Sequence, residues 1–112
     1  MALLSSDPFP RDGETVHSVV EAIGATLSIS DQRMQVSIPG VQRLQLDMPL
    51  SDLRRIQFDI ERDRPATMVI VPIHVHNTPQ VLAIPAAQYD LAARGLAHIG
   101  RFLADLKEGA GD

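Results

Sequence analysis

The sequence predicts an α+β fold, in which six short antiparallel strands are followed by one C-terminal helix. Between residues 25 and 84, apolar and polar side chains alternate with a period of two, interrupted by segments rich in Pro, Gly, Asn and Asp. This pattern is typical of antiparallel strands with one buried face. Between residues 86 and 107, apolar residues recur every three or four positions, as on one face of a helix. The chain has 112 residues, the size of a single domain.

Ahead of these strands lie an arm and a segment with two possible structures. Residues 1–13 contain prolines, serines and an Asp-Gly pair, and we expect them to form a flexible arm. In residues 14–23, valines and an isoleucine fall at i, i+3, i+4 and i+7, which predicts a short N-terminal helix that ends at Gly24. Valine also favours strands, and a strand is the alternative for this segment.

Four strands are expected next. The first three are separated by Asp31-Gln32 and by Pro39-Gly40, which are typical turn sequences. A Pro-Leu-Ser-Asp-Leu interruption at residues 49–53 precedes the fourth strand, and a charged loop at residues 62–65 follows it. The apolar residues of the four strands are, in order, Leu27 and Ile29; Met34, Val36 and Ile38; Leu44, Leu46 and Met48; and Ile56, Phe58 and Ile60.

The longest apolar run, residues 67–85, predicts a β-hairpin with its turn at residues 77–79. One face of its first strand carries only β-branched residues, so we expect this face to form the centre of the core, beneath the C-terminal helix. The other face mixes apolar and histidine side chains, and we expect a helix of this chain or a second subunit to cover its apolar part. Pro72 lacks a backbone donor and indicates an edge or a bulge in this strand. The first face consists of Val69, Val71, Ile73 and Val75, and the second of Met68, Ile70, Pro72, His74 and His76.

A helix is predicted from about residue 86 to residue 107. Its two glycines each cost about 1 kcal/mol relative to alanine, so Gly95 and Gly100 indicate close approach of the helix to the sheet. Residues 108–112 are rich in glycine, and we expect a flexible tail there. The single domain therefore spans residues 14–107. The apolar stripe of the helix is Ala92, Leu96, Ile99, Leu103 and Leu106, widened by Phe102.

Composition and charge argue against several classes of function. The net charge is -4 and aromatic residues make up only 4% of the chain, so nucleic-acid binding, which needs basic surface and stacking side chains, is not expected. The chain has no cysteine, which excludes disulfides and thiolate metal sites. No apolar run reaches the ~20 residues of a membrane span, and residues 1–13 lack the features of a secretory signal. We expect a cytoplasmic protein without membrane insertion.

Two histidines are weak candidates for a metal site. His74 and His76 are predicted on one strand face, about 7 Å apart, and small β-barrel metalloenzymes of the cupin type use a His-x-His pair of this kind. Such a site needs further ligands, which His17 or His98 would supply only if the fold brought them close. The alternative, two surface residues near a turn, is favoured, because a motif without its context is weak evidence. No cofactor and no catalytic residue are predicted.

Basic residues flank the fourth strand. Arg54 and Arg55 precede it, and Arg62 and Arg64 follow it, so this region could bind an anion or the carboxylates of a partner protein. Acidic residues interleave with the arginines, and a solvated edge of mixed charge is the alternative. These acidic residues are Asp52, Asp59, Glu61 and Asp63.

Residues 48–56, Met-Pro-Leu-Ser-Asp-Leu-Arg-Arg-Ile, resemble the strand, Pro-Leu, polar turn and strand of bacterial pleckstrin-homology-like domains. The Ile84-Pro85 pair, which leads into Tyr89-Asp90-Leu91 and a terminal helix, is similar to the close of that fold, and the resemblance covers about residues 25–106. It implies a strongly bent antiparallel sheet, a partly open barrel of about six or seven strands whose open end is plugged by the helix. The family usually has seven strands, so either residues 14–23 form the seventh or one strand is missing.

The resemblance also implies a binding or assembly module without catalysis, and bacterial members of the family are often oligomeric. We therefore predict a non-enzymatic protein-interaction and assembly module that self-associates, and we expect its partner to be another protein or further copies of the chain. Inositol-lipid binding is not expected, because residues 30–34 carry only Arg33 where lipid-binding members carry a basic cluster. The predicted interaction surface consists of Met68, Ile70, His74, His76, Arg54 and Arg55.

Two other functions fit the sequence. A small acidic chaperone or adaptor of bacterial secretion systems would also be short and helical at both ends, and it would be a dimer that co-purifies with one client peptide. A small metal-dependent barrel enzyme would use His74 and His76, and it would contain stoichiometric metal after purification without a tag.

Overall fold

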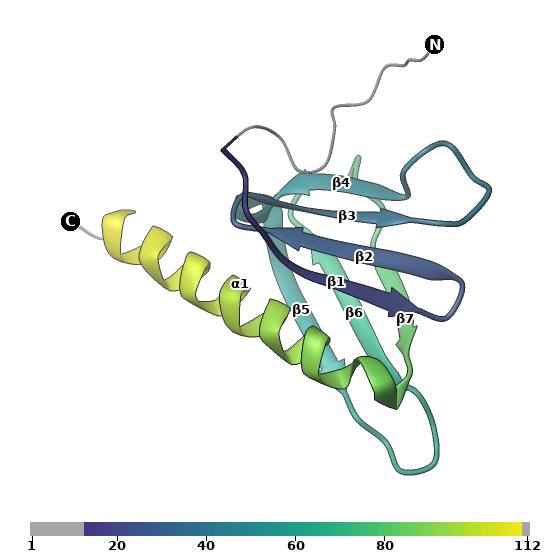
Figure 1. Cartoon of the computed structure of the whole chain (residues 1–112). Coiled ribbons are helices and arrows are strands. Elements are labelled where there is room, and N and C mark those ends of the chain that lie inside the picture. The colour runs from purple at the N-terminus through teal and green to yellow at the C-terminus, as the bar shows by residue number, and fades with distance from the viewer. Residues whose placement is uncertain (1–12, 111–112) are drawn as a thin grey trace.

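The computed structural model describes residues 13–110, and the side chains of residues 13–106. Seven strands form two antiparallel sheets, and one long helix runs along their side (Figure 1). The 3-10 turn η1 (Leu50–Asp52) joins the sheets, and the 3-10 turn η2 (Ala86–Gln88) leads into helix α1 (Tyr89–Ala110). The first sheet has the order β1 (Val16–Ala22), β2 (Ala25–Ser30), β3 (Arg33–Ser37), β4 (Leu46–Pro49), and the second has the order β5 (Leu53–Asp59), β6 (Ala66–Pro72), β7 (Gln80–Ile84).

The predicted α+β class is confirmed, but the predicted single, strongly bent sheet is wrong. The four strands β1 to β4 and the three strands β5 to β7 form separate sheets. Pro49 has no backbone donor to continue the ladder, and η1 turns the chain before β5 begins. At another corner, the Ile23 N–H donates to the Ala83 carbonyl at 2.8 Å and ties the end of β1 to β7.

The predicted N-terminal helix is also wrong, because residues 16–22 form strand β1. The strand pairs along its length with β2, and Gly24, at φ +77°, lies in the tight turn between them instead of ending a helix. Burial alternates as the strand period requires: Val20 is fully buried, whereas Val19 is 40% exposed on the other face. The strand alternative for residues 14–23 is therefore the correct one.

In β6 the two faces are the reverse of those predicted. Met68 and Ile70 are fully buried, opposite Phe58 and Ile56 on β5, and they belong to the core. The cover that we predicted for them is supplied within the chain, by the side chains of both sheets. These two residues are therefore not part of a surface, which corrects the predicted interaction surface. On the face predicted to be the core, Val69 and Val71 are only half-buried, and Ile73 and Val75 are 51% and 102% exposed.

The strand is also shorter than predicted. β6 ends at Pro72, and the residues that follow form a loop. A bulge faces this proline, because Leu53 pairs with Pro72 and Arg55 with Val71, which leaves Arg54 unpaired in the ladder. The prediction that Pro72 marks an edge or a bulge is confirmed.

The C-terminal helix is confirmed, and it packs on β1 and η1. Ser18 donates its hydroxyl hydrogen to the Leu91 carbonyl at 2.6 Å. A Cβ at Gly95 would lie 2.6 Å from Ile29 Cδ1, so the predicted close approach exists there, whereas Gly100 faces open space. α1 continues to Ala110, so residues 108–110 of the tail predicted at residues 108–112 are helical. The predicted arm lies, except for its last residue, outside the described residues.

Candidate functional site

His74 and His76 lie in the loop between β6 and β7 and not on a strand face. Their rings are stacked, with centroids 5.4 Å apart and planes 15° apart. His74 Nε2 is 3.6 Å from Asp52 Oδ1. Within residues 13–110, no group of three or more His, Cys, Asp or Glu side chains is placed to hold a metal ion. This arrangement gives the metal hypothesis no geometric support.

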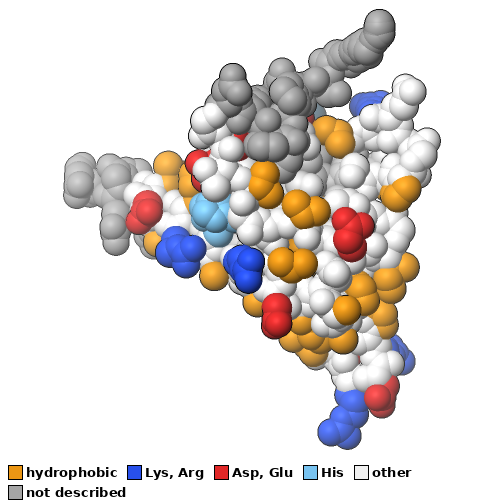
Figure 2. All heavy atoms as spheres, in the orientation of Figure 1, with side chains coloured by type: hydrophobic (Ala, Val, Ile, Leu, Met, Phe, Trp, Pro, Cys, Tyr) orange, Lys and Arg blue, Asp and Glu red, His pale blue; other side chains and the backbone are white. Residues whose placement is uncertain are grey.

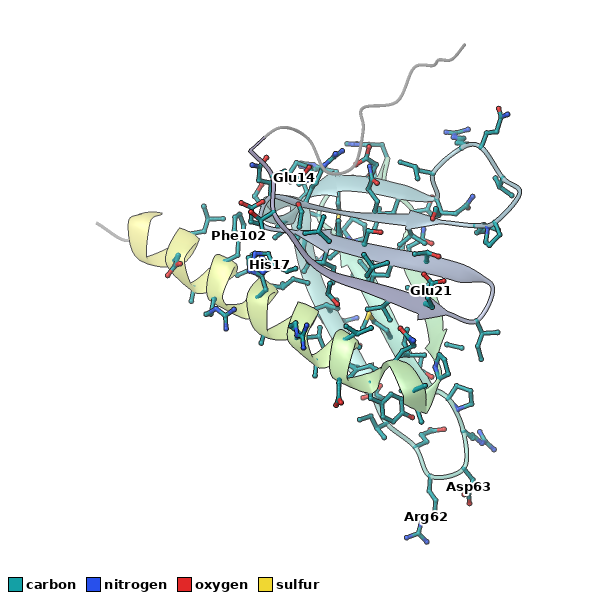
Figure 3. All side chains as sticks on the ribbon, in the orientation of Figure 1. Glu14, His17, Glu21, Arg62, Asp63 and Phe102 are labelled. Atoms are coloured by element: carbon teal, nitrogen blue, oxygen red, sulfur yellow. The ribbon has the colours of Figure 1, made fainter. Side chains whose placement is uncertain are left out.

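Arg54 and Arg55 are both exposed at the start of β5. Together with Val71 they line a shallow hollow on the surface of the second sheet. The other two predicted members of this basic region lie at the opposite end of the strand. Arg62 and the neighbouring Asp63 occupy the tip of the β5–β6 loop and point away from the body of the molecule (Figure 3). The four arginines therefore do not form one anion site.

The surface of the second sheet that faces away from the first sheet has an apolar centre and a charged border. Val81 on β7 lies opposite Val69 on β6 and is 70% exposed. α1 packs mainly against β1 and η1 rather than against the strands of the second sheet. We call it the outer face. It consists of Arg55, Gln57 and Asp59 on β5, Thr67, Val69 and Val71 on β6, and Val81 and Ala83 on β7.

Glu14 and Arg33 form a buried ion pair at one end of the first sheet, where Figure 3 labels Glu14. The guanidinium donates from Nε to Glu14 Oε2 at 2.9 Å and from Nη2 to Oε1 at 3.2 Å. The Glu14 side chain is 0% exposed and that of Arg33 is 5% exposed. The Ser30 hydroxyl donates to the carboxylate and accepts the Arg33 backbone N–H at 3.0 Å. A buried bidentate pair of this kind fixes local structure.

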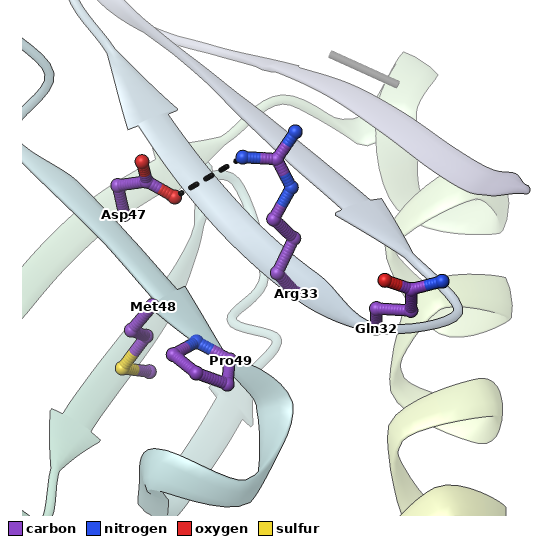
Figure 4. Close-up of a pocket in the computed structure, with 5 residues that line it drawn as sticks. All are labelled: Gln32, Arg33, Asp47, Met48 and Pro49. Atoms are coloured by element: carbon purple, nitrogen blue, oxygen red, sulfur yellow. Dashed lines mark ion pairs between the residues drawn. The ribbon is translucent and has the colours of Figure 1, made fainter. Parts of the chain in front are cut away.

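A pocket of about 250 Å³ opens beside this ion pair (Figure 4). Arg33 Nη1 lies 3.6 Å from Asp47 Oδ1, so the two charged side chains of the pocket face each other. Arg33 is already engaged with Glu14 as well, and we assign no ligand to this pocket. The lining residues are Gln32, Arg33, Asp47, Met48 and Pro49.

A second histidine pair lies between β1 and α1. The rings of His17 and His98 are stacked, with centroids 3.7 Å apart and planes 16° apart. Figure 3 shows His17 pointing from β1 towards the helix, and in Figure 2 histidine reaches the surface along the same seam. His98 Nε2 is buried without a hydrogen-bond partner among the described atoms. The two histidines thus help to pack the helix on the sheet, and among residues 13–110 they belong to no group of three or more possible metal ligands.

The pH dependence of stability is expected to report on His98. Burial lowers the pKa of His98, His17 and Arg101 lower it further, and Asp31 and a hydrogen bond with the Ser30 backbone oppose this effect. Because the unfolded state then binds the proton more tightly, the free energy of unfolding should fall as pH drops below about 6.5. The slope for one proton is at most about 1.4 kcal/mol per pH unit. Urea unfolding from pH 7.5 down to about pH 5 measures it.

The variants His98→Gln and His76→Gln separate this effect from other titrating groups. His98→Gln should flatten the decline in stability below about pH 6.5, whereas His76→Gln removes an exposed imidazole of the β6–β7 loop and serves as the matched control. An undiminished decline in His98→Gln would show that another group is responsible.

Sequence reasoning missed both of these buried features. Glu14 and Arg33 are separated by 19 positions, and no local pattern connects them. In the helix predicted for residues 14–23, Glu14 lies in the first turn, where a carboxylate is ordinary. The sequence suggests His17 and His98 only as additional metal ligands, and their stacking depends on β1 being a strand.

Comparison of the chain with known protein families and with curated proteins finds no match in either. No helix within residues 13–110 combines the length and the apolar character that crossing a membrane requires.

Proposed function

We propose that this protein is a non-enzymatic interaction and assembly module of pleckstrin-homology-like fold, which acts in the cytoplasm and associates with itself. The fold supports this proposal, because seven strands followed by one C-terminal helix are the number and order that the resemblance requires. Strand β1, Val16–Ala22, brings the number of described strands to seven. The division into two sheets replaces the single bent sheet expected at first.

The observation that carries the proposal is the outer face. Its central valines lie on neighbouring strands, and Val81 is 70% exposed. In the loop that follows β6, Ile73 and Val75 are also exposed, by 51% and 102%. Contiguous exposed apolar surface with a charged border is typical of protein–protein contacts. Arg54 and Arg55, which remain exposed, belong to this border, and His74 and His76 lie in the loop beside it.

Sedimentation velocity over a wide range of protein concentration tests this proposal. We expect the wild-type protein to associate and Val81→Asp to weaken that association, because the substitution buries an unpaired charge in the contact. Val19→Asp is the matched control, since Val19 is 40% exposed on β1, on the other sheet. The proposal would be overturned if the wild-type protein were monomeric at every concentration, or if Val81→Asp left its association unchanged.

A further inference from the structure

Strand β5 is an edge strand. It is the terminal strand in the order β5-β6-β7, and among the described residues its only strand neighbour is β6. It runs for seven residues from Leu53 to Asp59. Such an edge presents unpaired N–H and C=O groups, to which another strand can add by main-chain hydrogen bonding.

Charge is distributed unequally along this edge. On the outer face, β5 carries Arg55 near its beginning, Gln57 in the middle and Asp59 at its end, and all three are exposed. Charged side chains usually protect an edge strand from pairing. Here the two ends have opposite signs, so an antiparallel copy of the same strand would bring each positive end against a negative end.

We propose that a second copy of this chain pairs its β5 antiparallel with β5 of the first, with Gln57 on the two-fold axis. This inference rests on the self-association that the proposed function assigns to the protein, and it adds a contact at the sheet edge to the one at the outer face. In an isologous pair, residues on opposite sides of the axis face each other. Arg55 therefore lies opposite Asp59 of the second copy, and the symmetry repeats this contact.

The same register matches the inner side of the strand. Directly opposed residues of an antiparallel pair point to the same face, so Ile56 lies opposite Phe58 of the second copy. Both side chains are only half-buried in one chain. Phe58 is already held edge-to-face against Tyr89, with ring centroids 5.8 Å apart, so its side chain is ordered before association.

Other registers that preserve the two faces are less well matched. With Ile56 on the axis, Arg55 would oppose Gln57. With Phe58 on the axis, Gln57 would oppose Asp59. With Arg55 or Asp59 on the axis, two like charges would meet directly, which is unfavourable. The Gln57 register is the one that pairs opposite charges on one face and apolar residues on the other.

Pairing in this register would make one six-stranded sheet from the two three-stranded sheets. A two-fold axis perpendicular to the sheet keeps both outer faces on the same side. The exposed valines of each copy, Val69, Val71 and Val81, then lie on one extended surface. The β5 contact would therefore join the outer faces of the two copies into one larger apolar surface.

Charge exchange tests the contact. Arg55→Asp and Asp59→Arg should each weaken homodimerisation by at least about tenfold, because each variant brings two pairs of like charges together. An equimolar mixture of the two variants should form a heterodimer, since every opposed pair then has opposite signs. The double variant R55D/D59R should dimerise like the wild type. Sedimentation equilibrium measures the dissociation constants, and circular dichroism confirms that each variant is folded.

A cysteine cross-link gives an independent readout. The chain has no cysteine, so Gln57→Cys introduces a single thiol. Opposed residues of an antiparallel pair have Cα atoms about 4.5–5.5 Å apart, which is within disulfide range. Mild oxidation should convert Gln57→Cys to a covalent dimer faster than it converts Gln42→Cys, in which the thiol lies in the β3–β4 loop.

The outcomes separate this inference from the proposed function. Val81→Asp could abolish association while the charge exchanges leave it unchanged and Gln57→Cys cross-links no faster than Gln42→Cys. This result would overturn the β5 contact and leave the proposed function standing. Association that responds to the charge exchanges but not to Val81→Asp would support the β5 contact and overturn the role of the outer face. A monomeric wild type, or folded charge variants that do not form the heterodimer, would overturn the β5 contact.

Discussion

Replacing Glu14 with leucine is expected to lower the free energy of unfolding by about 3–5 kcal/mol, because it leaves the buried Arg33 guanidinium without its bidentate partner. Both side chains are almost fully removed from solvent. The Ser30 hydroxyl also loses this carboxylate as an acceptor and keeps only the longer contact with the Arg33 carbonyl, at 3.3 Å. Urea unfolding at pH 7 measures the loss, provided that the slope of the transition is unchanged.

Glu21→Leu is the matched control for this prediction. Glu21 lies on β1 and is exposed, and among the hydrogen bonds described its carboxylate contacts only the Thr26 hydroxyl, at 3.3 Å. Its replacement should change the stability by no more than about 0.5 kcal/mol. A comparable loss in Glu14→Leu and Glu21→Leu would contradict the special role of the buried pair.

A double-mutant cycle shows whether the two charges act together. Arg33→Met leaves a buried carboxylate and should also cost about 3–5 kcal/mol. In Glu14→Leu/Arg33→Met both charges are gone, and the double variant should be clearly more stable than the sum of the two single losses predicts. Additive losses would show that each side chain is stabilised by separate contacts.

Local signals in the sequence were sufficient for the helix and for most turns. The 3.6-residue period of the C-terminal segment predicts α1, and the close approach at Gly95 follows from the cost of a glycine inside a helix. The turn at Pro39-Gly40 is also confirmed, with Gly40 at φ +81°. In each case, the residues that determine the structure are neighbours along the chain.

Features that depend on distant residues could not be obtained in this way. The valines of residues 16–22 fit a helix stripe and a strand equally well, and pairing with β2 decides between them. The ion pair of Glu14 with Arg33 requires β1 and β3 to be in place. The prediction of the candidate site was the least accurate, because the predicted interaction surface included Met68 and Ile70, which are 0% exposed.

The choice of the wrong face in β6 has a specific physical cause. A period of two separates the residues of a strand into two faces, but it identifies the inner face only if the other face is polar. Here both faces are apolar at their start, with methionine and isoleucine on one and valines on the other. Their neighbours on β5 and β7 decide, because Met68 lies opposite Phe58 and Leu82 across the sheet.

Alanine substitution along β6 is expected to reveal this inversion as a large difference in stability. Met68→Ala and Ile70→Ala should each lower the free energy of unfolding by about 2–5 kcal/mol, because they open cavities among fully buried side chains. Val69→Ala should cost no more than about 1 kcal/mol, since it removes mainly strand propensity on the outer face. Val75→Ala should be within about 0.5 kcal/mol of the wild type.

These measurements must be made on the monomer, because association stabilises the folded state by mass action. Urea unfolding at the lowest practical protein concentration satisfies this condition, and a repeat at higher concentration shows any contribution of the outer face. If Met68→Ala and Ile70→Ala lowered the free energy of unfolding only slightly and Val69→Ala lowered it strongly, the valine face would be the core. Met68 and Ile70 would then be available to a partner, and the outer face and the β5 contact would both lose their basis.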